Sequence, residues 1–284
     1  MIAIRGQNLF ALNLIRKTVF GLLVVVGAPV LAQDTALVGL DRIEKASPWI
    51  AVGRLDAADG GFCTATLIAP NLVLTAAHCT YDSNGSGKPR RAKELTFRAG
   101  FRNGKAQAER KVIQIARPEE YLYNSGDTER NIRTDVALLR LARPIETHII
   151  NPFIVEPRPI SSGTVSVVSY GQGRSELPSL QRECQVLGAT RGLMVMDCNV
   201  TFGSSGAPVF KRDGQRLRIA SVISGTASFD GTRRTVGMAL PNMVSALKAQ
   251  MRANGPAPVA KARRIQLGGG RSGTGAKFVR VDGS

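Results

Sequence analysis

Three polar residues in this sequence have neighbours that suit them for nucleophilic catalysis. His78 stands next to a cysteine that could tie it to a strand and hold its ring still, as a general base requires. Asp135 opens an apolar run, so we expect its carboxylate at the edge of the core, where it needs a donor such as an imidazole N–H. Ser205 lies between two nearby glycines, which permit a tight turn whose backbone N–H groups can face an oxyanion.

Each of these residues also has an ordinary structural interpretation. His78 alone could be a buried structural histidine, and Asp135 alone could be a turn or cap residue. The sequence Gly203-Ser204-Ser205-Gly206 resembles a flexible linker, but the apolar, strand-like segment 208–210 follows it at once. It is the combination of the three segments that predicts a catalytic site.

The four cysteines form two locally spaced pairs, at 63 and 79 and at 184 and 198. In an exported chain this spacing favours disulfides. A zinc site is the competing interpretation, but the sequence has no Cys-x-x-Cys and only two histidines. We therefore expect neither a metal site nor a cofactor.

The first 32 residues have the pattern of a cleaved secretory signal. Arg5, Arg16 and Lys17 precede an apolar run over 19–30, and the segment ends in small residues at Ala32. This run is shorter than the roughly 20 apolar residues that span a bilayer, and no later stretch is long enough. We predict a secreted or periplasmic protein without a transmembrane segment.

The net charge is strongly positive, at +17, and removal of the three cations of the leader leaves +14. Such a surplus could attract nucleic acid. The cations are spread along the chain and no aromatic residues are interleaved with them, so we expect a solvated basic surface and no specific nucleic-acid partner.

Short β-rich runs alternate with turn signals, which is typical of a sandwich or barrel. The candidate strands are 49–55, 62–68, 72–75, 95–99, 112–115, 136–141, 165–170, 184–187, 193–196, 209–211, 219–224 and 235–238. The one helix with clear periodicity runs from Asn242 to about Ala253. A polar connection over 142–159 divides the strands into two halves, which we interpret as two barrels.

These patterns predict five parts of the chain. They are a signal peptide (1–32), an N-terminal segment or short pro-region (33–47), a first barrel with His78 and Asp135 (48–145), a second barrel with Ser205 and the helix (146–253), and a basic, glycine-rich tail (254–284). For the tail we expect disorder.

The segments 75–79, 135–139 and 203–208 resemble the three signature blocks of the chymotrypsin–trypsin-like serine peptidases, in that family's order of His, Asp and Ser. The resemblance covers roughly residues 48–253, and the serine turn is most similar to that of bacterial glutamyl endopeptidases. It implies an all-β fold of two six-stranded barrels with the active site between them and a C-terminal α-helix.

The resemblance also implies a role for each residue. Ser205 would be the nucleophile, His78 the general base and then acid, and Asp135 the residue that orients His78. The backbone N–H groups of Gly203 and Ser205 would form the oxyanion hole. The implied bridges are Cys63–Cys79 and Cys184–Cys198, and the implied substrates are proteins or peptides. We expect the protein to be a monomer.

The segment around Ser224 would serve substrate binding. Ser224 matches the serine that supports the triad aspartate, and Ser224, Gly225 and Thr226 match the edge strand that pairs with substrate backbone. Asn199, six residues before Ser205, matches the position that in this family selects the substrate side chain. Asn199 is not the acid that would favour a basic side chain, and Ile223 stands where the glutamyl enzymes have a histidine, so a small or apolar side chain is expected.

One position departs from the trypsin pattern. Trypsin-like zymogens have an acid just before the nucleophile, which captures the N-terminus released on activation, and here Ser204 stands there. We therefore predict that no such zymogen switch operates. The alternative function is a catalytically silent protein of this fold that binds partners through its basic surface, although such proteins usually lack a triad residue.

Overall fold

The computed structural model describes residues 36–123, 125 and 128–254. The predicted signal peptide, the first residues of the N-terminal segment and the tail from residue 255 lie outside the described residues. In the described part, no helix has the length and apolarity needed to cross a membrane.

Six antiparallel strands close into the first barrel in the order β2-β3-β4-β7-β6-β5. They are β2 (Val52–Ala57), β3 (Phe62–Ala69), β4 (Leu72–Thr75), β5 (Leu95–Ala99), β6 (Ala108–Ala116) and β7 (Ala137–Leu141). Alternation along these strands directs apolar side chains such as Leu67, Leu74 and Leu138 into the interior, where they are fully buried.

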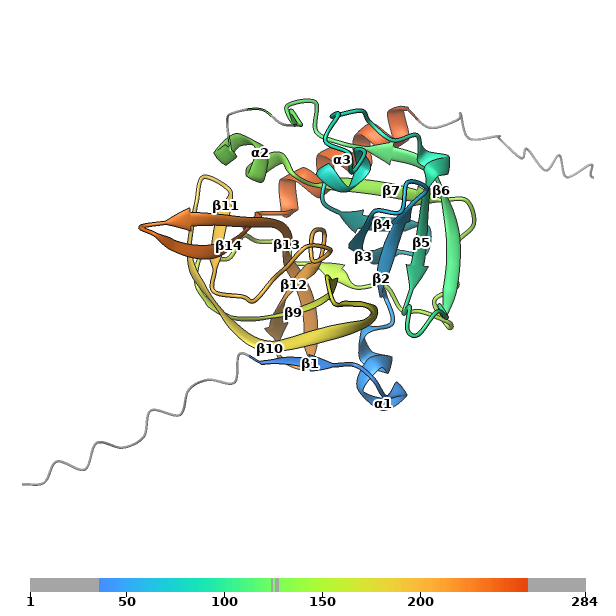
Figure 1. The fold of residues 1–284 in the computed structure, drawn as a ribbon, viewed down its shortest axis with the longest axis horizontal. Helices are drawn as coiled ribbons and strands as arrows, with labels where there is room; N and C mark the ends of the chain where they lie inside the picture. The colour runs from blue at the N-terminus through green and yellow to red at the C-terminus, as the bar shows by residue number, and fades with distance from the viewer. Residues whose placement is uncertain (1–35, 124, 126–127, 255–284) are drawn as a thin grey trace, which may run out of the picture. The chain divides into compact units, whose positions relative to one another are not determined.

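The second barrel is also a ring of six strands. They are β9 (Gly163–Gly171), β10 (Arg174–Thr190), β11 (Leu193–Met196), β12 (Pro208–Asp213), β13 (Arg216–Phe229) and β14 (Thr232–Met238). Their order is β10-β11-β14-β13-β12-β9, and the antiparallel pairing of β9 with β10 closes the ring. The prediction of two six-stranded barrels is therefore confirmed, and Figure 1 shows them side by side.

Two short strands are added to the second barrel. β1 (Leu37–Gly39) pairs antiparallel with Ser179–Gln181 of β10, and Figure 1 shows it along the outer side of that strand. β8 (Ile154–Val155) pairs parallel with β13 and lies within the segment that the sequence predicted as a plain connection. The strands of each barrel fall inside the predicted halves, whose limits at 145 and 146 stay a prediction.

The C-terminal helix α3 (Pro241–Ala253) begins one residue before the predicted start and has a proline in its first turn. Its buried face consists of Val244, Leu247 and Met251. This face packs on β6 and β7 of the first barrel, and Gln114 Nε2 on β6 donates a hydrogen bond to the Met251 carbonyl, 3.1 Å away. The helix thus ties the end of the second half to the first barrel.

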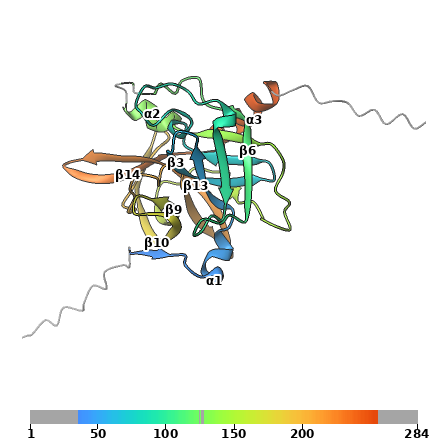
Figure 2. The same ribbon diagram turned by 45° about the vertical axis from the view of Figure 1, so that its right-hand side comes forward.

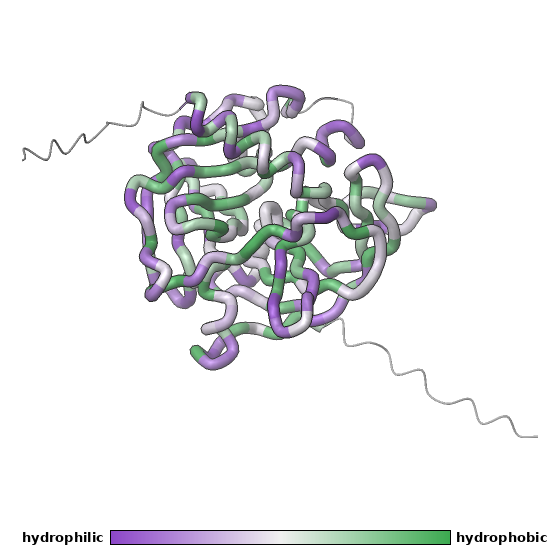
Figure 3. The backbone as a smooth tube through the Cα atoms, turned by 180° about the vertical axis from the view of Figure 1, so that it is seen from behind, coloured by the Kyte–Doolittle hydropathy of each residue, from purple (hydrophilic) through white to green (hydrophobic). Residues whose placement is uncertain are grey.

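Some element boundaries differ from the sequence prediction. The first strand begins at Val52 and not at Trp49, because Ser47–Trp49, with Pro48, forms a 3-10 turn. The predicted strand 184–187 is the middle of the much longer β10. Helices α1 (Ile43–Ala46) and α2 (Thr128–Thr134) and the 3-10 turns His78–Thr80 and Ala92–Glu94 were not predicted. Along the backbone, apolar segments lie mainly in strands and polar ones in the loops (Figure 3).

Candidate active site

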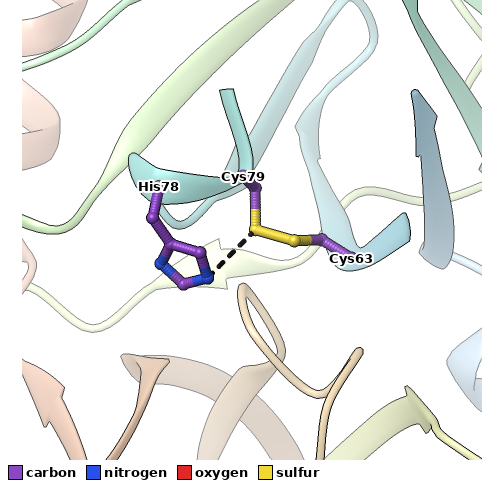
Figure 4. A group of neighbouring side chains, drawn as sticks. All are labelled: Cys63, His78 and Cys79. Atoms are coloured by element: carbon purple, nitrogen blue, oxygen red, sulfur yellow. Dashed lines mark hydrogen bonds between the residues drawn. A yellow bond between two sulfur atoms is a disulfide. The ribbon is translucent and has the colours of Figure 1, made fainter. Parts of the chain in front are cut away.

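His78 is positioned by the end of a buried strand and by a disulfide. It opens a 3-10 turn three residues after β4, and the next residue, Cys79, is bonded to Cys63 on β3. Figure 4 shows the imidazole beside this bridge, with His78 Nε2 3.7 Å from Cys79 Sγ. In the chain-entropy model, a bridge that closes about 15 residues contributes on the order of 3 kcal/mol.

The same group of His78, Cys63 and Cys79 lies within the spacing of a metal site. Its two sulfur atoms are bonded to each other in the disulfide, so neither is a thiolate ligand. The second predicted bridge, Cys184–Cys198, is also formed, and it joins β10 to the chain that leaves β11 within the core of the second barrel.

Asp135 holds His78 by two contacts. Its Oδ1 accepts the backbone N–H of His78 at 2.8 Å, and its Oδ2 lies 2.7 Å from the ring nitrogen Nδ1. Ser224 on β13 donates from Oγ to the same Oδ2 at 2.5 Å. The carboxylate is 3% exposed, so these donors offset the loss of its hydration. A ring fixed through Nδ1 presents Nε2 to the other side, as a general base must.

The surroundings of His78 change its basicity. Burial of the ring disfavours the charged form, but the charge of Asp135 and its hydrogen bond to the ring outweigh this effect and hold the pKa of His78 above its ordinary value. The imidazolium that forms when the ring takes a proton is therefore stabilised in place.

Activity should follow the titration of this ring. Only the neutral imidazole can accept a proton, so kcat/KM should rise as the pH rises through the pKa of His78, with a midpoint above the ordinary histidine value of about 6.5. In Asp135→Asn the midpoint should move down, and the plateau should fall about 10⁴-fold. A pH profile on one peptide substrate checks both effects. Equal midpoints for parent and variant would contradict this electrostatic role of Asp135.

The turn that contains Ser205 requires glycine at two positions. Gly203 has φ +88° and would place a Cβ 2.4 Å from the Phe62 ring. Gly206 has φ +78°, and a Cβ there would lie 2.2 Å from the Thr64 carbonyl oxygen. The first barrel thus packs directly against the serine turn, and a side chain at either glycine would force the two apart.

Thr64 on β3 joins the first barrel to this turn by hydrogen bonds. Its Oγ1 donates to the Gly203 carbonyl at 2.8 Å, and its backbone N–H donates to the Ser205 carbonyl at 2.9 Å. The backbone N–H groups of Gly203 and Ser205, by contrast, have no acceptor among the described residues. Two free N–H groups on one tight turn can receive an oxyanion.

The serine and the histidine face a common cavity of about 410 Å³. Phe62, Phe202 and the Cys63–Cys79 bridge form apolar parts of its wall. Ser205 Oγ makes no hydrogen bond to His78 within the described residues, which is common for catalytic groups that tighten only when substrate binds. Phe202 is 81% exposed, so this aromatic ring is available to a bound chain.

A second cavity, of about 180 Å³, also has Ser205 in its wall. Its lining includes Ser224, Gly225 and Thr226, as the resemblance implied, and also Arg233 on β14. Asn199 does not line it; its backbone N–H instead bonds Gln181 Oε1 at 2.7 Å. Of the substrate-binding residues suggested by the sequence, three are thus brought together and one is not.

Sequence reasoning missed Arg233, although one signal could have located it. Asp230 and Gly231 both have positive φ and form the two-residue turn between β13 and β14, which Figure 2 shows as a projecting hairpin. An Asp-Gly pair is a strong hairpin signal. Counting back from it pairs Ser228 with Arg233, whose Nε donates to Thr226 Oγ1 at 2.9 Å.

Two closed barrels with a histidine–aspartate pair on one and a glycine-framed serine turn on the other define the trypsin-like peptidase class. The family model described as trypsin-like peptidase domain matches residues 63–217, more than half of the chain. The chain therefore belongs to this family of serine peptidases.

Individual relatives are distant. Human Kallikrein-11 is 30% identical over 121 residues, which are 42% of this chain and 39% of that protein. Serine protease 23 of Bos taurus is 27% identical (54% and 44% covered), and Trypsin Blo t 3 of Blomia tropicalis is 28% identical (52% and 53%). The chain spans about half or less of the length of these relatives. A solved structure of a Glu endopeptidase in complex with MPD superposes with a TM-score of 0.62 at 18% identity, over 78% of this chain and 99% of that one, and thus shares its fold.

Proposed function

We propose that this chain is a secreted serine endopeptidase that hydrolyses peptide bonds through an acyl-enzyme at Ser205. The observation that carries the proposal is the arrangement of His78, fixed through Nδ1 by a buried Asp135, with Ser205 on the wall of the same cavity. The two barrels supply these groups separately, which suits a substrate chain lying between them.

The proposed reaction has two symmetrical halves. Ser205 Oγ attacks the scissile carbonyl while His78 Nε2 takes its proton, and the oxyanion is received by the N–H groups of Gly203 and Ser205. Collapse of this intermediate breaks the C–N bond, and His78 returns the proton to the leaving amine. Water then attacks the acyl-enzyme by the same route and regenerates the serine. Asp135 stabilises the imidazolium in both halves.

Two disulfides support the proposed export, because such bridges persist mainly in oxidising compartments. Secreted or periplasmic location, action on protein or peptide substrates and function as a monomer are parts of the same proposal. The signal peptide over 1–32 and the basic tail stay predictions from the sequence.

A peptidyl phosphonate that labels active serines tests the proposed chemistry directly. We expect covalent labelling of the protein, with the adduct found on Ser205 by mass spectrometry of a digest. Failure to label a folded sample, together with no cleavage of casein, would instead favour the catalytically silent alternative.

For the substrate side chain before the cleaved bond, the charge in the 180 Å³ cavity favours an acid. Arg233 lines this cavity, and the neighbouring Thr226 and Ser224 supply hydroxyl groups. A guanidinium binds a carboxylate by charge-assisted hydrogen bonds, whereas a lysine or arginine of the substrate would be repelled. We therefore propose a preference for glutamate or aspartate, in place of the small or apolar residue expected from sequence.

Charge reversal at Arg233 should reverse this preference. In Arg233→Glu, kcat/KM for a peptide with glutamate at the cleavage site should fall about ten- to hundredfold relative to the same peptide with leucine, as expected for a lost charged hydrogen bond. Parallel assays of matched glutamate, leucine and lysine peptides measure the change.

Arg234→Glu is the matched control, because it makes the same charge change on the next residue of β14, whose side chain points to the other face. A parent enzyme that cleaves leucine peptides better than glutamate peptides, or equal effects of the two variants, would contradict the assignment to Arg233.

A further inference from the structure

The hairpin between β9 and β10 lies against the serine turn. The backbone N–H of Gln172 donates to the Phe202 carbonyl at 2.7 Å, and a Cβ on Gly203 would lie 3.2 Å from Gly171 Cα. A side chain at Gly171 would meet the guanidinium carbon of Arg174 at 2.9 Å. Because Gly171 has no side chain, the guanidinium of Arg174 has room to contact Ser204 in the serine turn.

Arg174 makes three hydrogen bonds there. It donates from Nη1 to the Ser169 carbonyl, and from Nη2 to Ser169 Oγ at 3.0 Å and to Ser204 Oγ at 3.1 Å. Ser204 is fully buried, and its hydroxyl also donates to the Tyr170 carbonyl at 3.2 Å and accepts the Thr201 N–H at 3.3 Å. Ser204, which lies between Gly203 and Ser205, is thus held in place by the guanidinium of Arg174.

No carboxylate forms an ion pair with Arg174 in the part of the chain that the structure describes. Burial lowers the pKa of this guanidinium, although arginine stays charged in proteins. A partly buried cation without a counter-ion is unfavourable in itself. In the reaction proposed above, a complementary negative charge would develop at the N–H groups of Gly203 and Ser205, which are the two neighbours of Ser204.

We propose, on the basis of the function proposed above, that Arg174 is a positioning residue that holds the oxyanion hole in its active form through Ser204. It takes the place of the ion pair that N-terminal cleavage creates in trypsin-like zymogens. Ser204 cannot be the acid of such a pair, and the N-terminal strand Leu37–Gly39 is instead hydrogen-bonded to β10. The hole is consequently organised by the folded chain itself.

The test compares Arg174→Ala and Arg174→Lys with Arg182→Ala, an exposed arginine on the same strand, as the matched control. In Arg174→Ala, kcat should fall about 100-fold while KM changes little, since loss of one oxyanion-hole donor has an effect of this size. Arg174→Lys should be intermediate, because an ammonium lacks the planar fork. Millimolar guanidinium should restore part of kcat in Arg174→Ala, whereas the same concentration of sodium chloride should not.

Hydrogen exchange gives a readout that does not depend on activity. Peptides covering 201–206 should exchange at least tenfold faster in Arg174→Ala than in the parent or in Arg182→Ala, with peptides of the first barrel unchanged. Unchanged kcat and unchanged exchange would overturn the proposal. A uniform rise in exchange, with a lower Tm and no rescue by guanidinium, would also overturn it, by showing a general structural role.

The two proposals fail in different ways. An enzyme that is never labelled by the phosphonate, but whose 201–206 segment is ordered by Arg174, would disprove the peptidase function and keep the positioning role. An active enzyme whose Arg174→Ala variant is labelled at the parental rate would keep the function and disprove the role of Arg174.

Discussion

Replacement of Ser205 by alanine should abolish peptidase activity and leave the fold intact. The expected loss in kcat is on the order of 10⁶-fold, because the nucleophile of such a site acts as a unit with its base. Ser205 Oγ makes no hydrogen bond among the described residues, so its removal should break no structural contact. Residual catalysis of roughly 10³–10⁴-fold over water should persist from the oxyanion hole and binding.

The measurement is cleavage of casein by the purified variant, together with circular dichroism and a count of free thiols. Both disulfides should be formed, and the phosphonate label should be absent. Cleavage at the parental rate by a pure sample would show that another residue is the nucleophile.

Replacement of His78 by glutamine should have a similarly large effect, again on the order of 10⁵–10⁶-fold in kcat. Glutamine keeps the backbone N–H that binds Asp135 Oδ1, so the variant removes the base while preserving that contact. The comparison is with His148→Gln, which changes the only other histidine. His148 is exposed in the connection between the barrels, so its variant should stay within about twofold of the parent.

Initial rates for both histidine variants on one peptide substrate decide the matter. Large loss in His148→Gln with activity retained in His78→Gln would mean that the wrong histidine was taken as the base. Loss of activity in both variants, with a lower Tm in each, would indicate a folding defect. The rate of phosphonate labelling of Ser205 would then show which histidine acts as the base.

The parts of the fold that depend on local pattern could be predicted from the sequence. The buried runs of β3, β4 and β7 are apolar and bounded by turn residues, so their positions were predicted to within a residue or two. The predicted triad residues lie close to such runs, which is why their segments were recognisable. Trp49 was misassigned because its aromatic character favours a strand, whereas the preceding Pro48 starts a 3-10 turn.

The contacts that sequence could not reveal join residues far apart in the chain. Arg174 is a single cation among many, and only the approach of the β9–β10 hairpin to the serine turn shows that it contacts Ser204. The Asp-Gly turn could have paired Arg233 with Ser228, but it could not show that Arg233 and Ser205 line one cavity. The same holds for Thr64, whose hydrogen bonds to the serine turn span about 140 positions of sequence. Propensity and periodicity describe neighbours along the chain, so they carry no information on such contacts.

The pairing of β1 with β10 has a consequence for the order in which this molecule can be completed. Leu37–Gly39 is among the first described segments to be synthesised, yet its partner Ser179–Gln181 is made some 140 residues later. A chain that emerges from its N-terminus can form the first barrel, with His78 and Asp135, while Ser205 does not yet exist. The residues of the proposed site can therefore come together only after the second barrel has begun to form, because Ser205 belongs to that later half of the chain.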